Sequence, residues 1–308
     1  MCAANGKSRR SPRRDDPKCD AAATFDWSAL LEEAVNTPGA LSQAYGAFHS
    51  FSIGNQLLAL FECLRRGLPI GPIATYNGWQ KVGRQVRKGE RAISLWMPLM
   101  IMPRGNTAPR PDDPGPDGAV ISLRRIFVFR AHWFTLAQTD GESVQPRVLP
   151  DWSADRALAA LGIAEEPFAH LDGNCQGYAR GATIAVSPIA YAPDRTRLHE
   201  MAHVVLGHTS EGKASTAEPA AFVDRDERTP RDLREVEAEA VAYLCISALG
   251  LDGQACSRGY LQHWLRSVPR PAGEKAVPEK SVHRIFRAAD QILKAGRPAA
   301  DPAPADPE

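Results

Sequence analysis

Apolar residues recur at helical spacing over the first part of the chain. In residues 24–35 they fall three or four positions apart, and Thr24 precedes them as an N-cap residue. Residues 51–66 repeat the pattern up to Gly67, a typical helix stop. We therefore expect residues 24–64 to be helical.

The pattern changes to short runs and turns from about residue 74 onward. Turn dipeptides at Asn77-Gly78 and Lys88-Gly89 separate these runs, and residues 119–136 are rich in the β-branched and aromatic residues that favour strands. Between them, residues 103–118 contain Pro, Gly and Asp with no apolar period, which predicts a mobile connection between two strands. The first half is thus predicted to be a small module of helices and antiparallel sheet.

A polar, proline-containing stretch at residues 141–153 separates this module from a second set of elements. Beyond it the pattern predicts a hairpin in residues 174–188 and several helices. The expected fold class is α+β, in which a mixed domain precedes a mainly helical domain with a short sheet. The expected ranges are a disordered basic tail at 1–22, domains at 23–142 and 150–296, and a disordered tail at 297–308.

Charge is distributed unevenly along a chain whose net charge is only +1. Residues 1–140 hold 18 basic and 12 acidic residues, whereas the rest of the chain is acidic. This asymmetry favours a polyanion as partner of the first half. No apolar run approaches the roughly 20 residues that span a bilayer, no secretory signal opens the sequence, and the 6 cysteines form no CxxC pair. We expect a cytoplasmic protein with no membrane partner.

Residues 197–208, RLHEMAHVVLGH, contain the pattern HExxH. Its His199 and His203 are four positions apart, so both imidazoles leave one face of a helix and can share a zinc ion. Glu200 projects beside them, where it can act as general base on a water activated by the metal. Apolar residues surround the pattern, and buried histidines are costly unless they are liganded or hydrogen-bonded. His208 is off this helical spacing, so we expect it to be structural or to support the site.

A third protein ligand is expected from the helix that contains REVEAEAVAY at residues 234–243. Glu235 and Glu239 are four apart and share a face, whereas Glu237 points roughly 200° away from Glu235. One carboxylate can bind the metal while the other orients a ligand histidine. The spacing leaves open which glutamate does which. The apolar strand at residues 181–188 is expected to provide an edge for an extended peptide substrate.

The pairing of HExxH with a following ExxAE helix resembles the gluzincin arrangement of small intracellular metallopeptidases, including the ImmA/IrrE-like group. This resemblance implies a Zn²⁺ site in which His199, His203 and Glu235 are the ligands. It also implies that Glu200 is the base and that Glu239 orients a ligand.

The segment from residue 75 to residue 96 combines aromatic residues with cations. Aromatic faces that stack bases, and cations that contact the backbone, are what a single-strand binding surface requires. The alternative is a core in which Trp79 is buried and the cations are only solvated. The predicted DNA-binding residues are Tyr76, Trp79, Lys81, Arg84, Arg87 and Lys88.

The order Tyr-x-x-Trp, Gly, then Val-Arg-Lys-Gly-Glu before a strand resembles the N-terminal single-stranded DNA-binding domain of ArdC-type antirestriction proteins. In that family a zincin-like metallopeptidase domain follows, which is the order found here. The resemblance implies an antirestriction protein that binds single-stranded DNA and protects incoming mobile DNA, such as a plasmid, from restriction. Two alternatives are a zinc endopeptidase acting on a repressor or restriction subunit, and a metal-stabilised DNA-binding module without catalysis.

Overall fold

A computed structural model describes residues 25–101, 124–145, 148–169, 174–209, 229–267 and 277–298. The predicted tail at 1–22 and the loop at 103–118 lie outside these residues, as does most of the tail at 297–308. No helix among the described residues is long and apolar enough to cross a membrane.

Three helices begin the described chain. They are α1 (Trp27–Asn36), α2 (Ala40–Phe48) and α3 (Ile53–Arg65). The first begins one residue after Asp26, whose carboxylate accepts a hydrogen bond from the Ala29 amide, so Asp26 is the N-cap and the prediction of Thr24 was wrong. Helix α3 begins after Ser52, and Gly67 follows its end with a positive φ of 62°.

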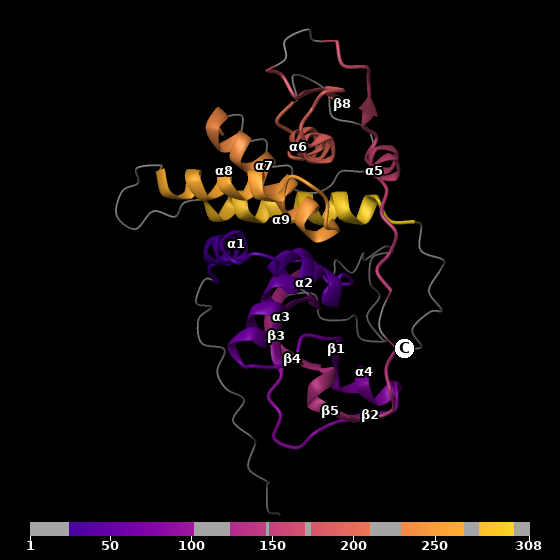
Figure 1. The fold of residues 1–308 in the computed structure, drawn as a ribbon. Coiled ribbons are helices and arrows are strands. Elements are labelled where there is room, and N and C mark those ends of the chain that lie inside the picture. The colour runs from indigo at the N-terminus through magenta and orange to yellow at the C-terminus, as the bar shows by residue number, and fades with distance from the viewer. Residues whose placement is uncertain are drawn as a thin grey trace, which may run out of the picture.

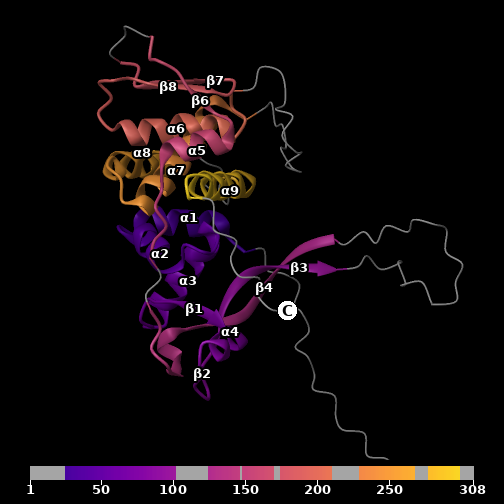
Figure 2. The same cartoon turned by 90° about the vertical axis from the view of Figure 1, so that its right-hand side faces the viewer.

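An antiparallel sheet follows these helices, in the strand order β1-β4-β3. A smaller pair, β2 and β5, lies beside it. The elements are β1 (Ile73–Thr75), α4 (Tyr76–Lys81), β2 (Arg84–Val86), β3 (Ile93–Ile101), β4 (Arg124–Thr135), the 3-10 turn η1 (Leu136–Gln138) and β5 (Thr139–Gly141). Figure 2 shows β3 and β4 extending away from the helices.

The rest of the chain is mainly helical with a short sheet, in the strand order β6-β8-β7. The elements are α5 (Ala154–Leu161), β6 (Ala164–Glu165), β7 (Gly177–Arg180), β8 (Thr183–Val186), α6 (Pro193–Val205), α7 (Arg231–Leu249), α8 (Gln254–Ser267) and α9 (Glu279–Ala295). The predicted hairpin is β7 and β8, and the predicted α+β class with a mixed first part is confirmed.

The hydrophobic core continues across the predicted domain boundary. Figure 1 shows α1 and α2 beneath α7, α8 and α9, with α6 on the far side of that helical layer. Buried side chains of α1–α3 and of α7–α9 belong to one cluster. Helix α9 also caps α3, because Asp290 accepts a hydrogen bond from the first α3 amide at 2.8 Å. The two parts of the chain therefore stabilise each other through shared apolar burial.

Candidate metal centre

Helix α6 presents the two histidines of HExxH on one face. Pro193 occupies its first turn, where a missing N–H costs nothing, and Leu198, Met201 and Ala202 face the core. Because these apolar residues fix which side of α6 faces the core, the side chains of His199 and His203 point in the same direction. Their Nε2 atoms lie 3.1 Å apart. This convergence is what i, i+4 spacing predicts.

Helix α7 brings Glu235 to the same point. Its Oε2 lies 3.5 Å from the Nε2 of His199 and 3.6 Å from the Nε2 of His203. These residues form a group in which one donor atom from each lies within 4.8 Å of the others. A tetrahedral ion with bonds of about 2.0–2.1 Å separates its donors by about 3.3 Å, so the spacing fits a metal such as zinc. The tertiary structure thus selects Glu235, which the sequence left open against Glu239.

Glu239 instead lies behind His199. Its Oε2 accepts a hydrogen bond from the Nδ1 of His199 at 3.0 Å, which leaves the Nε2 lone pair free for a metal. Arg195 holds this carboxylate with two contacts of 2.7 Å and also donates to Ser257. Glu239 is only 2% exposed, so the ion pair is needed to compensate its buried charge. The predicted orienting role is consistent with this geometry.

An equivalent support for His203 was not predicted from the sequence. The Nδ1 of His203 lies 3.0 Å from the Nδ1 of His208, whose Nε2 lies 2.9 Å from Glu237 Oε2. Because a carboxylate only accepts, the Nε2 of His208 carries its hydrogen, and its Nδ1 lone pair accepts the hydrogen of His203. Arg284 approaches the same Glu237 oxygen at 3.5 Å.

This series from His203 to Arg284 orients His203 as Glu239 orients His199. Glu237 is fully buried, on the α7 face opposite Glu235. Gly207 allows the turn that returns His208 toward α6, with a φ of 76°. Glu237 stands in a helix otherwise rich in alanine, and a glutamate buried there needs a polar partner. This was the signal in the sequence that could have predicted the partner of Glu237.

The electrostatics match a site built to hold a cation. Burial alone would lower the pKa of His199, but its hydrogen bonds to Glu235 and Glu239 outweigh this and raise it to about 9. The contacts of Glu235 with His199 and His203 lower the pKa of Glu235 strongly. Burial raises the pKa of Glu200 and lowers the pKa of His208, which favours the neutral His208 inferred above.

The side chain of Glu200 extends from α6 toward the short sheet. It is 8% exposed, and a methyl group on Gly177 of β7 would lie 3.1 Å from its Oε1. The predicted peptide-binding edge was wrong, because β8 is paired with β6 on one side and β7 on the other. Strand β7 is one of the two outer strands of this described sheet, and its Gly177 lies beside Glu200.

The predicted DNA-binding residues divide into three groups. Trp79 is 2% exposed and donates its indole hydrogen to the Phe134 carbonyl, so its inclusion in a stacking surface was wrong. Tyr76, Lys81 and Lys88 are exposed.

Two arginines of that surface have structural contacts. Arg84 donates to the carbonyls of Thr139, Gly141 and Glu142. Arg87 pairs with Glu90 and Asp140. Arg84 is half-buried, whereas Arg87 remains exposed beside its acidic partners, so Tyr76, Arg87 and the two lysines are the exposed members of the predicted surface.

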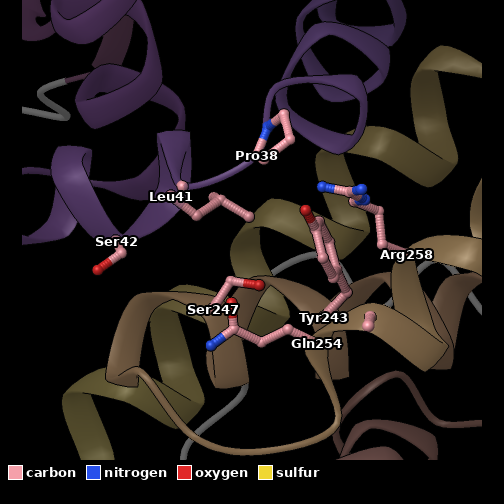
Figure 3. Close-up of a pocket in the computed structure, with 9 residues that line it drawn as sticks. Pro38, Leu41, Ser42, Tyr243, Ser247, Gln254 and Arg258 are labelled. Carbon is pink, nitrogen blue, oxygen red and sulfur yellow. The ribbon is translucent and has the colours of Figure 1, made fainter.

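A cavity of about 230 Å³ lies between the start of α2 and the helices α7 and α8. Figure 3 shows Tyr243, Ser247 and Arg258 around it. Its lining includes none of the residues that form the metal centre.

Residues 23–129 match the family model for the N-terminal domain of the anti-restriction factor ArdC. A crystal structure of the antirestriction protein ArdC from plasmid R388, metal-free, is similar with 21% identity and a TM-score of 0.47. The Mn(II)-bound structure of that protein has 20% identity and a TM-score of 0.46. Each comparison covers 88% of this chain and 98% of the other. No curated protein matches the chain significantly.

Proposed function

We propose that this chain is an antirestriction protein that binds single-stranded DNA and protects incoming mobile DNA, because its residues 23–129 match the model of the ArdC N-terminal domain. The observation that carries the proposal is the exposure of Tyr76 and Lys81 on α4 and of Lys88 in the turn after β2. The Tyr76 hydroxyl accepts a hydrogen bond from Gln85, which holds α4 beside β2. An aromatic face flanked by cations suits sequence-tolerant binding of a single strand.

Fluorescence anisotropy with labelled single-stranded oligonucleotides tests this function. Binding should be tight at low salt and should weaken steeply as salt rises, because phosphate contacts release counterions. Replacing Lys81 and Lys88 with alanine should reduce the slope of log affinity against log salt by about 0.7 for each phosphate that is no longer neutralised. Absence of binding at low salt would refute the proposed function.

A second candidate function is that of a zinc metallopeptidase acting on a repressor or restriction subunit. It is favoured by the buried Glu200 beside the group of His199, His203 and Glu235. Zinc held by these donors would polarise a substrate carbonyl and water. Glu200, whose pKa burial raises, is placed to accept and return a proton.

Glu200→Gln separates the two functions. The variant keeps the ligands, so its metal content and DNA affinity should match those of the wild type. Loss of protection against restriction in cells would show that proteolysis contributes. Retained protection would show that the metal centre has only a structural role in this function.

That structural role defines the third candidate, a metal-stabilised module without catalysis. Binding to the folded state alone stabilises it by mass action. Thermal unfolding is therefore compared with Zn²⁺, with Mn²⁺ and with chelator, since imidazole and carboxylate ligands accept either ion. His199→Ala should abolish the metal-dependent shift, and a shift that persists would place the metal elsewhere.

A further inference from the structure

Strands β3 and β4 continue past β1 as a two-stranded ribbon. Strand β1 pairs only with the end of β4, from Trp133 to Thr135. The stretch from Arg124 to Ala131 pairs with β3 alone. Figure 2 shows the two strands leaving the helices at this point. The inner end of this ribbon still packs on the helices, because Leu95 is fully buried, whereas Phe127 farther out is 62% exposed.

One face of this ribbon is aromatic. The register places Trp96 opposite Phe129 and Pro98 opposite Phe127, and directly opposed residues share a face. Phe127 is 62% exposed and Phe129 is 46% exposed. Their positions two residues apart place the rings about 7 Å from each other on that face. Two large aromatic side chains in solvent, on a strand that could bury them, indicate a binding surface.

The inner end of this face is anchored to the core. The rings of Trp96 and Phe129 lie 5.4 Å apart, and Trp96 lies 5.9 Å from Trp27 of α1. Trp27 in turn lies 5.9 Å from Phe286 of α9. The aromatic row thus begins in the hydrophobic core and ends in solvent at Phe127. Anchored rings lose little conformational freedom when a partner binds.

The charge of the ribbon has a single sign. Neither β3 nor β4 contains an aspartate or glutamate. Arg125 lies on the aromatic face, opposite Met100, and Arg130 is also exposed. Neither arginine forms an ion pair with another described residue. A second copy of this chain would bring like charges together, whereas a polyanion would be attracted.

We propose that the aromatic face of this ribbon, formed by Trp96, Phe127, Phe129 and Arg125, is a base-stacking platform for single-stranded nucleic acid. Bases stack on the two phenylalanines while Arg125 contacts a phosphate. This inference rests on the single-stranded DNA function proposed above, and it assigns the stacking role that the buried Trp79 lacks. The platform does not include Lys81 of α4 or Lys88, which follows β2.

Affinity for a labelled oligo-dT strand tests the platform. Phe127→Ala and Phe129→Ala should each weaken binding by roughly 5- to 150-fold, the loss expected for one stacked base, while the salt slope stays unchanged. Arg125→Ala should instead reduce the salt slope by about 0.7. Tyr191→Ala is the matched control, because Tyr191 is 87% exposed and belongs to the other part of the chain.

Leucine variants separate stacking from simple apolar docking. Phe127→Leu keeps apolar area but loses the aromatic face, so it should bind nearly as weakly as the alanine variant. Full binding by Phe127→Leu would overturn the proposal. Since Phe129 touches Trp96, its variants are checked by thermal unfolding, and Phe127 decides the outcome if Phe129→Ala is destabilised.

Other outcomes distinguish failure of the platform proposal from failure of the proposed single-stranded DNA function. If the wild type binds and both alanine variants match it within twofold, the platform is wrong and the DNA function stands. If the wild type does not bind at low salt, both are wrong. Loss of self-association in the alanine variants, with unchanged DNA affinity, would assign the ribbon to contacts between copies and overturn the proposal.

Discussion

Removing the imidazole of His208 tests how the metal centre is supported. In His208→Ala the Nδ1 hydrogen of His203 loses its acceptor at 3.0 Å, and Glu237 loses its closest partner. The His203 ring is then free to rotate or to place its hydrogen on Nε2, where the metal requires a lone pair. The ligands themselves are unchanged, so any loss of metal affinity comes from their orientation.

The expected loss follows from burial. The side chains of His208 and Glu237 are 4% and 0% exposed, so water cannot easily replace the missing bond. An unsatisfied buried donor costs about 1–3 kcal/mol, and changes behind a metal ligand typically lower metal affinity 10–100-fold, or about 1.4–2.8 kcal/mol. Glu237→Gln should have a smaller effect, because its amide oxygen can still accept from His208.

Competition against a chromophoric zinc chelator measures these affinities. His132→Ala is the control, since His132 is exposed on β4 and distant from the site in the chain. The expected order of weakening is His208→Ala, then Glu237→Gln, with the control equal to the wild type. Circular dichroism verifies that the apo variants are folded. A zinc affinity of His208→Ala within twofold of the wild type would refute the orienting role.

Three further changes test the fold and the ligand set. Gly177→Ala would place a methyl group 2.6 Å from Thr196 Cγ2, so its free energy of unfolding in urea should fall by about 1–3 kcal/mol. Gly46→Ala is the control, because Gly46 faces open space within α2, and its free energy of unfolding should rise by roughly 0.5–1 kcal/mol. Glu235→Ala removes a ligand, so it should lower zinc affinity by more than the roughly 100-fold expected when a residue behind a ligand is changed. A zinc affinity equal to that of Glu237→Gln would exclude Glu235 as a ligand. Burial raises the pKa of Asp290 from 3.8 to about 7. The folded protein keeps this proton up to about pH 7 whereas the unfolded chain releases it near pH 4, so stability falls as pH rises between these values. Asp290→Asn should remove that fall and be more stable by about 2–4 kcal/mol at pH 8, and an unchanged pH profile would contradict the assignment.

Local patterns predicted most of the elements and half of the metal centre. The turn expected at Asn77-Gly78 was wrong, because these residues lie within the helix α4. The i, i+4 spacing of His199 and His203 depends only on helix geometry, so it predicted the convergence of their Nε2 atoms. The hairpin of β7 and β8 followed from the apolar runs and from Gly181, whose φ is 57°. Helix starts were predicted less well, because Asp26 caps α1 where Thr24 was expected.

Burial of single residues was decided by packing between segments far apart in the chain. The sequence offered Trp79 both as a stacking ring and as a core residue, and its hydrogen bond to Phe134, 55 positions away, decides for the core. The same sheet leaves Phe127 exposed, although it lies within the short apolar run at residues 126–129 of β4. Strand order likewise placed β8 in the middle of its sheet.

The sequence by itself determined which chemistry the chain can carry, namely imidazole and carboxylate ligands on two helices and an uneven charge along its length. Only the tertiary structure decided that Glu235 meets the histidines, while Glu239 and Glu237 support them from behind. The reason is physical. Spacing along one helix sets the direction of a side chain, but the distance between donors on two helices depends on how those helices pack.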